Sequence, residues 1–407
     1  MEYPLAMKVL KGHKFRVDFS ESQEALACKT AGVCRAIYNI ALQQRTTAYH
    51  SVSRHRIYYE GQASEISELK EAFPWIGEVP YHCIQQSLKN LQTAFKNFFE
   101  GHADYPTMKK KFYEDSFKFP DPKQFQVDEE NQRIRLPKFG WISYRNGKGK
   151  HALKLAGEIK SITISRCADQ WFASVLCEME VSNPKPVTGI PIGIDLGVVK
   201  TIATSQRETL EIVGMSKEDW KKKAKLQRNL ARKKKGSRNR KKVGRKLARF
   251  DAKIARRRRD SIHKATTYLA KNHSLIVMED LKVKNMTKSA KGTKKKPGNN
   301  VKAKSGLNRS IMNVGFGEIR RQLEYKCQWY GSELRKVTPN FTSQECPKCH
   351  HIAKENRISQ SVFCCVKCNH TENADYNATE NILAAGQAVS ACGGNAVRSR
   401  RSRKTAA

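Results

Sequence analysis

The spacing of apolar positions in the first hundred residues predicts a strand that leads into a helical block. Residues 14–19 alternate between polar and apolar side chains, which is the period of a strand. Ser20 follows, with Gln23 three residues later, and this pair has the pattern of a capping box at a helix start. Apolar residues then recur at helical spacing, and they do so again over residues 81–99.

The pattern changes in the next part of the chain. Residues 105–142 are rich in proline, aromatic side chains and lysine. From Trp171 to Val181 every second residue is apolar or a cysteine, so these side chains share one face of a strand, and Ile162 and Ile164 precede them across a short turn. We interpret this region as a β-barrel or sheet that the N-terminal strand completes and into which the helical block is inserted.

Two buried strands that end in acidic residues mark the second half of the chain. Residues 190–195 are an apolar run that ends at Asp195, and residues 274–280 are a second run that ends at Glu279 and Asp280. The remaining pattern predicts, in order, a hairpin strand at 201–205, a flexible loop at 287–306, a helix at 315–330, a strand at 334–337, a helix at 375–385 and a disordered basic tail at 386–407. The whole therefore predicts a multidomain α/β fold.

Composition adds a polyanionic partner to this picture. The 407 residues suggest two to four domains, and 77 Lys and Arg against 38 Asp and Glu give a net charge of +39. Such a charge calls for a polyanion, either nucleic acid or an anionic membrane surface. We expect no membrane span, because no run of about 18 apolar residues occurs, and the N-terminus lacks the pattern of a signal peptide. Nucleic acid and a cytoplasmic or nucleoid location are the expectation.

About half of this charge lies in one segment. Residues 221–264 hold 22 Lys and Arg against two acids, which gives a net charge of +20. Val243, Leu247, Phe250 and Ile254 nevertheless keep a helical stripe. We predict basic helices that pack on one face and present charge on the other.

Three acids in separate segments are candidates for one site. Asp195 and Glu279 stand at strand ends and Asp375 opens a helix. In open α/β sheets, ligand sites gather at the carboxyl ends of the strands. Converging carboxylates can hold two Mg²⁺ ions, which is the arrangement that hydrolyses phosphodiesters. Asp280 competes with Glu279, and the pattern alone leaves that choice open.

Four cysteines predict a structural zinc site. Cys346 and Cys349 form one C-x₂-C pair, and Cys365 and Cys368 form another after 15 residues. This spacing is typical of a closed, tetrahedral Zn²⁺ site. Cys364 could replace Cys365 only by breaking the spacing. Three nearby histidines are spare donors, which we place outside the ligand set: His350, His351 and His370.

The order of these motifs resembles TnpB, the OrfB-type protein of bacterial insertion sequences and a relative of type V CRISPR effectors. GIDLG at 193–197, the basic block, VMEDL at 277–281, the four cysteines and ADYNATENI at 374–382 follow one another as in that family. Shorter matching segments include RAIYN at 35–39, QSLKNLQTAFKNFF at 86–99, LPKFGW at 136–141, GEIRRQLEYK at 317–326 and TSQECPKC at 342–349. The resemblance covers nearly the whole chain.

The resemblance implies an RNA-guided DNA endonuclease that cuts double-stranded DNA next to a short motif. It implies the triad Asp195, Glu279 and Asp375, and so favours Glu279 over Asp280. It also implies a guide RNA as partner, a monomeric protein within the ribonucleoprotein, and base pairing as the reader of sequence. The implied division is a wedge β-barrel at 1–19 and 119–185, a helical recognition domain at 20–118, a RuvC-type (RNase H-like) nuclease domain at 186–339 and 371–385 with a basic helical insertion at 215–270, and a zinc ribbon at 340–370.

Nucleic-acid contacts are predicted in two places. By position in the family, five residues are candidates to touch DNA near the adjacent motif: Tyr59, Gln85, Lys89, Lys123 and Gln124. In the basic block the candidates are Arg232, Lys233, Lys234, Arg238, Arg240, Arg245, Arg256 and Arg257.

The chain departs from the family pattern at a few positions, and other functions are compatible with it. Asn373 stands where an acid is common, Phe316 where tryptophan is usual, and His350 and Asn369 where glycine often follows each cysteine pair.

Three alternatives share this architecture: a guide-bound DNA-binding regulator with an inactive site, a transposase, and a small type V CRISPR effector. The presence of all three acids favours an active nuclease.

Overall fold

The computed structural model describes residues 7–111, 115–147, 152–293 and 295–391. The chain separates into two compact units. One comprises Met1–Ser182 with Gly244–Arg249, and the other comprises Asn183–Val243 with Phe250–Ala407. No helix among the described residues is long and apolar enough to cross a membrane.

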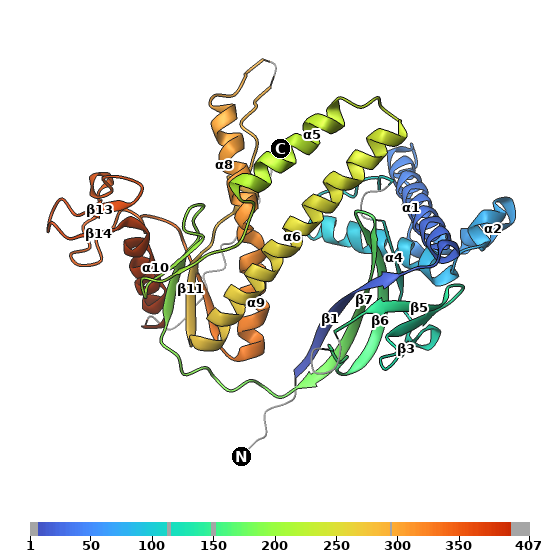
Figure 1. Cartoon of the computed structure of the whole chain (residues 1–407), viewed down its shortest axis with the longest axis horizontal. Helices are drawn as coiled ribbons and strands as arrows, with labels where there is room; N and C mark the ends of the chain where they lie inside the picture. The colour runs from blue at the N-terminus through green and yellow to red at the C-terminus, as the bar shows by residue number, and fades with distance from the viewer. Residues whose placement is uncertain (1–6, 112–114, 148–151, 294, 392–407) are drawn as a thin grey trace. The chain divides into compact units, whose positions relative to one another are not determined.

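The first unit contains an antiparallel sheet of seven strands in the order β2-β6-β7-β1-β5-β4-β3 (Figure 1). Strand β1 (Met7–Asp18) pairs with β7 (Gln170–Val181) along most of its length and with β5 at its end. The other strands are β2 (Ser116–Phe119), β3 (Gln126–Asp128), β4 (Arg133–Leu136), β5 (Gly140–Arg145) and β6 (Glu158–Cys167). The N-terminal strand thus completes this sheet, as expected, but it begins at least seven residues earlier than its alternation predicted. Leu10 is 56% exposed, so the pattern there carries no core signal.

The predicted core face of β7 is confirmed, because Trp171, Ala173, Val175 and Cys177 are all buried. Helices of the same unit form a second core. They are α1 (Glu21–His50), α2 (Tyr59–Ala72), α3 (Pro74–Gly77) and α4 (Tyr81–Phe99), with Ile37, Ile66 and Leu88 among their buried contacts. The capping box at Ser20 and Gln23 is present, so the helix starts where the sequence predicted.

The second unit is built on a mixed sheet of five strands in the order β10-β9-β8-β11-β12. Strands β8 (Ile192–Asp195), β11 (Leu275–Glu279) and β12 (Glu333–Val337) run parallel, with β11 between the other two. Strands β9 (Ile202–Thr204) and β10 (Thr209–Leu210) complete one side as an antiparallel hairpin.

Helices cover both faces of this sheet. On one face, Ile194 and Met278 pack with Ile262 of α6 (Arg238–Asn272) and Ile319 of α9 (Phe316–Tyr330). On the other face, Val277 packs with Ile382 of α10 (Ala374–Ala391). Because side chains along a strand alternate between faces, Asp195 and Glu279 both belong to the α10 face. The sheet period therefore directs both acids towards the helix that carries Asp375.

Two glycines let α10 approach the sheet closely. A Cβ atom at Gly193 of β8 would overlap the backbone oxygen of Thr379, and one at Gly386 of α10 would overlap the side chain of Val277. The helix continues to Ala391, so the predicted end at 385 is wrong, and residues 386–391 of the predicted tail are helical. The helix is extended because this segment packs on Val277. The small residues of the segment gave no sign of that contact in the sequence. The rest of that tail, 392–407, lies outside the described residues.

The expected flexible loop at 287–306 is also wrong at its end, because α8 (Val301–Val314) begins inside it. Its buried residues, Ile311 and Val314, lie at the far end of the helix, so the lysine- and glycine-rich start gave no helical signal. The short helix α7 (Val283–Met286) precedes it, and α5 (Lys217–Ala231) precedes α6.

Candidate active site and metal centre

Three carboxylates meet at one edge of the mixed sheet. Asp195 ends β8, Glu279 ends the neighbouring parallel strand β11, and Asp375 lies in the first turn of α10. The register sets Met278 opposite Ile194, so the two strand-end acids lie side by side. The two strand-end acids are therefore neighbours, and Asp375 is near enough for its charge to act on Asp195.

Burial, and then repulsion by the neighbouring acids, raises the pKa of Asp195. Burial and then the charges of Glu279 and Asp375 raise it from 3.8 to about 6, while the Leu196 N–H and the Arg357 guanidinium act in the opposite direction. A cluster of oxygen ligands that repel one another in this way is the environment that a divalent cation relieves. The donor set thus fits Mg²⁺.

Glu279 and Asp280 have different hydrogen-bond partners in the structure. Glu279 Oε1 accepts a hydrogen bond of 2.6 Å from Thr342 Oγ1, which fixes the direction of the carboxylate. Asp280 instead accepts one of 2.6 Å from Arg320. The charge of Glu279, not that of Asp280, is among those that raise the pKa of Asp195. The geometry therefore favours Glu279 as the third acid of the cluster.

Neighbouring residues outside the predicted set of acids complete this site. Thr342 orients Glu279, and Asn373 Oδ1 accepts a hydrogen bond of 3.1 Å from the Asp375 N–H at the start of α10. Lys200 lies with its Nζ 3.9 Å from Asp375 Oδ2. No periodicity marks these residues, since Lys200 is one of 77 cations and the other two have common polar side chains.

The four predicted cysteines converge on one point. The Sγ atoms of Cys346, Cys349, Cys365 and Cys368 all lie within 4.8 Å of one another, and two of the pairs are 3.5 and 3.6 Å apart. A tetrahedral ion with Zn–S distances of about 2.3 Å separates its sulfurs by roughly 3.8 Å. The cluster therefore has the size of a four-thiolate metal site, and Cys364 stands outside it in strand β13 (Val362–Cys364).

The backbone around the cysteines forms two equivalent turns. Cys346 O accepts from the His350 N–H and Cys365 O accepts from the Asn369 N–H, both at 2.9 Å. His350 and Asn369 both adopt positive φ, at 55° and 57°. Glycine is the usual residue in this conformation. The two departures from the family pattern therefore occur where a side chain adds conformational strain to the turn. His350 Nδ1 also lies 3.0 Å from Glu345 Oε1.

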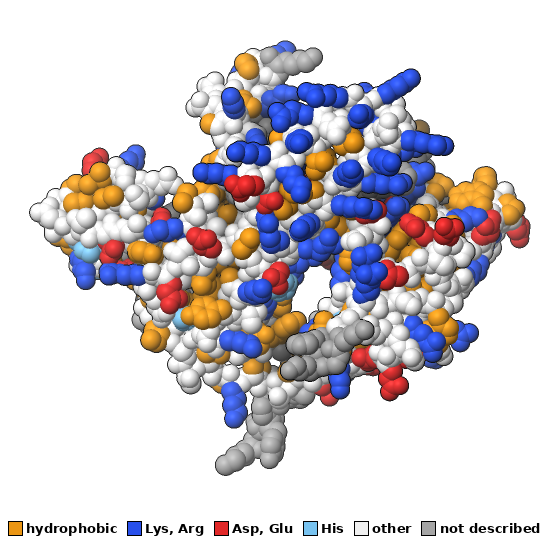
Figure 2. Space-filling model, in the orientation of Figure 1, with side chains coloured by type: hydrophobic (Ala, Val, Ile, Leu, Met, Phe, Trp, Pro, Cys, Tyr) orange, Lys and Arg blue, Asp and Glu red, His pale blue; other side chains and the backbone are white. Residues whose placement is uncertain are grey.

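The basic segment forms the helices α5 and α6 and the turn between them, as predicted. Val243 and Ile254 are buried, whereas six of the eight candidate cations are exposed: Arg232, Lys233, Lys234, Arg238, Arg245 and Arg256. Figure 2 shows Lys and Arg side chains gathered over these helices. Arg240 and Arg257 differ, because Arg240 donates to Leu230 O at 2.6 Å and Arg257 pairs with Asp219. Their guanidinium groups already hold the segment together.

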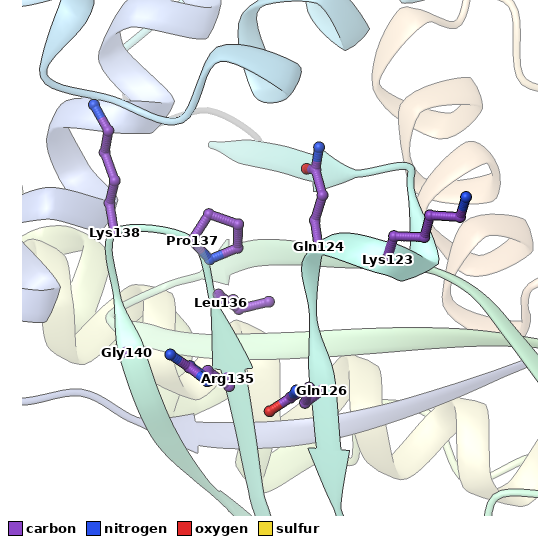
Figure 3. A pocket seen from close by; sticks show the side chains of 8 residues that line it. All are labelled: Lys123, Gln124, Gln126, Arg135, Leu136, Pro137, Lys138 and Gly140. Atoms are coloured by element: carbon purple, nitrogen blue, oxygen red, sulfur yellow. The ribbon is translucent and has the colours of Figure 1, made fainter.

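The candidates for motif contacts lie in two places within the first unit. Lys89 Nζ lies 5.6 Å from the centre of the Tyr59 ring, and Gln85 donates to the Tyr81 hydroxyl at 3.2 Å. Lys123 and Gln124 line a hollow of about 360 Å³. Figure 3 shows them on one side of it and Pro137 and Lys138 on the other. The remaining residues that line it are Gln126, Arg135, Leu136 and Gly140.

Similarity to solved structures defines the class of fold. The chain aligns with the Cas12f1 protein of the "Cryo-EM structure of the Cas12f1-sgRNA-target DNA complex" with a TM-score of 0.53 and 15% identity, over 92% of this chain and 99% of that one. The model "Cas12f1-like, TNB domain" matches residues 316–382, which include the four cysteines. The chain thus shares the multidomain fold of Cas12f-type nucleases.

Sequence comparison gives the family. The model "Probable transposase" of OrfB type matches residues 174–290, and a "Helix-turn-helix domain" model matches residues 7–53, which fold here as β1 and α1. The chain is 45% identical to "Putative RNA-guided DNA endonuclease InsQ" of Escherichia coli K12, over 95% of both chains. It is 34% identical to a "Putative RNA-guided DNA endonuclease" of Streptomyces pristinaespiralis, over 96% of this chain and 92% of that one. The chain therefore belongs to the TnpB family.

Proposed function

We propose that this protein is an RNA-guided DNA endonuclease that binds a guide RNA and cleaves double-stranded DNA next to a short motif, in one RuvC-type (RNase H-like) site. The observation that carries the proposal is the placement of Asp195 and Glu279 at the carboxyl ends of parallel strands, with Asp375 beside them at the start of α10. The names of the two relatives, which align over nearly their whole length, support the same activity.

In the proposed site the chain supplies three oxygen ligands on a rigid frame. Asp195 and Glu279 would hold Mg²⁺ from neighbouring strand ends, and Asp375 from the start of α10. The hydrogen bond from Thr342 holds the Glu279 carboxylate in one orientation. Bound Mg²⁺ ions supply the activation of water and the stabilisation of the leaving oxygen in phosphodiester hydrolysis.

The basic helices would bind the sugar-phosphate backbones of the guide RNA and of the heteroduplex. Exposed cations such as Arg232, Lys233 and Arg238 offer charge without a pattern that could read bases. Base pairing by the guide would select the sequence, and the two candidate places of the first unit would read the adjacent motif. In this proposal the first unit contains the wedge and recognition domains and the second contains the nuclease domain.

The four-cysteine cluster would hold a structural Zn²⁺ ion, because four thiolates leave no open position for a substrate. Its place next to the site gives it a positioning role. Thr342 precedes Cys346 by four residues, and Asn381 of α10 donates to Thr342 O at 2.9 Å and to Glu345 O at 2.7 Å. The cluster would thereby keep Thr342 against both Glu279 and α10.

The direct test is to purify the protein, sequence the RNA that accompanies it, and offer plasmids that carry the matching target with Mg²⁺. We expect cleavage that requires the RNA, the target and the divalent ion, and no cleavage by the Asp195→Ala variant, which should still bring RNA with it. Purified protein without RNA, or cleavage that survives Asp195→Ala, would overturn the proposal.

A further inference from the structure

The turn after Asp195 brings Lys200 back to the carboxylate site. The Gly197 N–H donates to Thr201 O at 3.3 Å, and a Cβ atom at Gly197 would overlap the backbone oxygen of Lys200. The turn is therefore tight, and it fixes the backbone of Lys200 five residues after Asp195 at the same edge of the sheet.

The side chain of Lys200 lies against the first turn of α10. Its Nζ donates to Asn373 Oδ1 at 3.2 Å and lies 4.2 Å from the centre of the Tyr376 ring. The same Asn373 oxygen accepts the Asp375 N–H, so Lys200 joins the group that starts the helix. The Lys200 side chain is 31% exposed, which shows that it is held against the protein and not extended into water.

The ammonium group keeps unused hydrogen-bonding capacity. It has three N–H donors, and Asn373 takes one of them, the only such bond that its Nζ makes within the described part of the chain. Asp375 Oδ2, at 3.9 Å, is beyond the 2.7–2.9 Å of a charge-assisted hydrogen bond. At least one donor beside the carboxylates thus has no acceptor of hydrogen-bonding distance.

The Asp375 carboxylate holds Lys200 at a place that also favours a bound phosphate. The start of α10 carries the positive end of the helix dipole, which repels a cation and attracts phosphate. A phosphodiester that approaches the three carboxylates brings negative charge to this place. Positive groups that face the developing charge of a reacting phosphate are a recurrent means of stabilising its transition state.

We propose that Lys200 is a further residue of the active site, whose ammonium group contacts a non-bridging oxygen of the phosphodiester that is cut. The assignment rests on the proposed nuclease function. Asn373 and Tyr376 position the ammonium, and its remaining N–H donors are available to the substrate. The same charge opposes the binding of Mg²⁺ to Asp375, so its contribution is made to the reaction and not to the affinity for the metal ion.

The test compares Lys200→Met and Lys200→Arg in the full chain with its accompanying RNA. Single-turnover cleavage of target DNA at saturating Mg²⁺ should fall by about tenfold or more in Lys200→Met, which is the loss expected for one hydrogen bond to a charged group. Lys200→Arg should retain more cleavage than Lys200→Met, because it keeps the charge although the guanidinium differs in shape. Lys96→Met, on an exposed lysine of α4 that pairs with Glu100, should cut like the wild type.

A second measurement separates this role from a structural one. Mn²⁺ titrated into the same complexes without target DNA should bind to Lys200→Met as tightly as to the wild type, or more tightly. Wild-type cleavage by Lys200→Met would overturn the assignment. So would a variant that binds Mn²⁺ more weakly and cuts like the wild type once the metal ion is saturating. A wild-type complex that fails to cut would instead overturn the proposed function on which it rests.

Discussion

At the scale of single residues, Asp195 is the most informative group, because its ionisation is opposed by burial and by two neighbouring acids. Its pKa is raised from 3.8 to about 6. In the folded chain without metal the protonated form is therefore favoured relative to the unfolded chain. This group contributes stability below pH 4 that is lost as the pH rises through 6. A site that destabilises its own fold until a cation arrives is typical of functional clusters.

The first prediction follows from that sign. Without divalent cations at pH 7–8, Asp195→Asn should raise the free energy of unfolding by about 2 kcal/mol, since two pKa units correspond to about 2.7 kcal/mol before allowance for partial exposure. Denaturant unfolding over a pH series measures it, and the difference from wild type should vanish below pH 4. The same variant should lose cleavage by about 1,000-fold or more. An unchanged stability at pH 8 would contradict the raised pKa of Asp195 that burial and the two neighbouring acids produce.

At the scale of the element, the site depends on how closely α10 approaches the sheet. Gly193 lies on β8, two residues before Asp195, and its missing side chain leaves room for the backbone of Thr379. The buried partner is backbone, which cannot move aside without the helix. Any added atom there must displace α10 and with it Asp375.

The second prediction is that Gly193→Ala destabilises the second unit by about 1–3 kcal/mol, the usual cost of overpacking. It should also reduce cleavage although no acid is changed. Gly306→Ala is the matched control, because that glycine lies within α8 with nothing near its Cβ position. The control should leave cutting unchanged and add up to about 1 kcal/mol. Thermal unfolding and cleavage of both variants measure the contrast, and equal effects would contradict the role of Gly193.

The third prediction concerns the cysteine cluster. Cys349→Ser should lower the zinc content of the purified protein below one ion per chain and weaken the region around Thr342, because structural zinc contributes on the order of several kcal/mol to the fold that it closes. Cys364→Ser is the matched control, since Cys364 lies next to the cluster but outside it. Elemental analysis and limited proteolysis decide the matter. Equal zinc loss in both variants would mean that the ligand set is wrong.

Elements with a strong period could be predicted from the sequence, and elements fixed by distant packing could not. The helix at Tyr81–Phe99 and the buried face of β7 follow from spacing alone. The end of α10 and the start of α8 were missed, because the contacts that extend them involve glycine and residues far along the chain. The acids and cysteines were found by their position at element ends and by their spacing. Lys200 and Thr342 were not, since only the fold brings them to the site.

At the scale of the molecule, the charge of +39 is distributed unevenly and so has a local meaning. The turn between α5 and α6 presents exposed cations, whereas Arg240 is used within the protein to bond Leu230 O and Lys233 O. A variant that tests binding by charge must therefore leave Arg240 in place. Otherwise a disrupted turn would be mistaken for a lost contact with nucleic acid.

The fourth prediction uses the four exposed residues of that turn: Arg232, Lys233, Lys234 and Arg238. Their combined replacement by glutamine should weaken binding of the accompanying RNA and reduce the slope of log K against log salt by about 3, because each phosphate contact contributes about 0.7–0.9 to that slope. The effect should be independent of RNA sequence, since such cations contact phosphate and not bases. Filter binding over a range of KCl concentrations measures the slope.

The control for this prediction must lose the same charge elsewhere. Four exposed lysines of the first unit serve the purpose: Lys8, Lys96, Lys110 and Lys154. If net charge alone attracted the RNA, both quadruple variants would change the affinity and the slope equally, because a general attraction depends on total charge. If the turn makes close phosphate contacts, only the first variant reduces the slope, because counterion release depends on charges placed against the phosphates. Equal slopes in the two variants would therefore refute a dedicated RNA-binding role for the turn between α5 and α6.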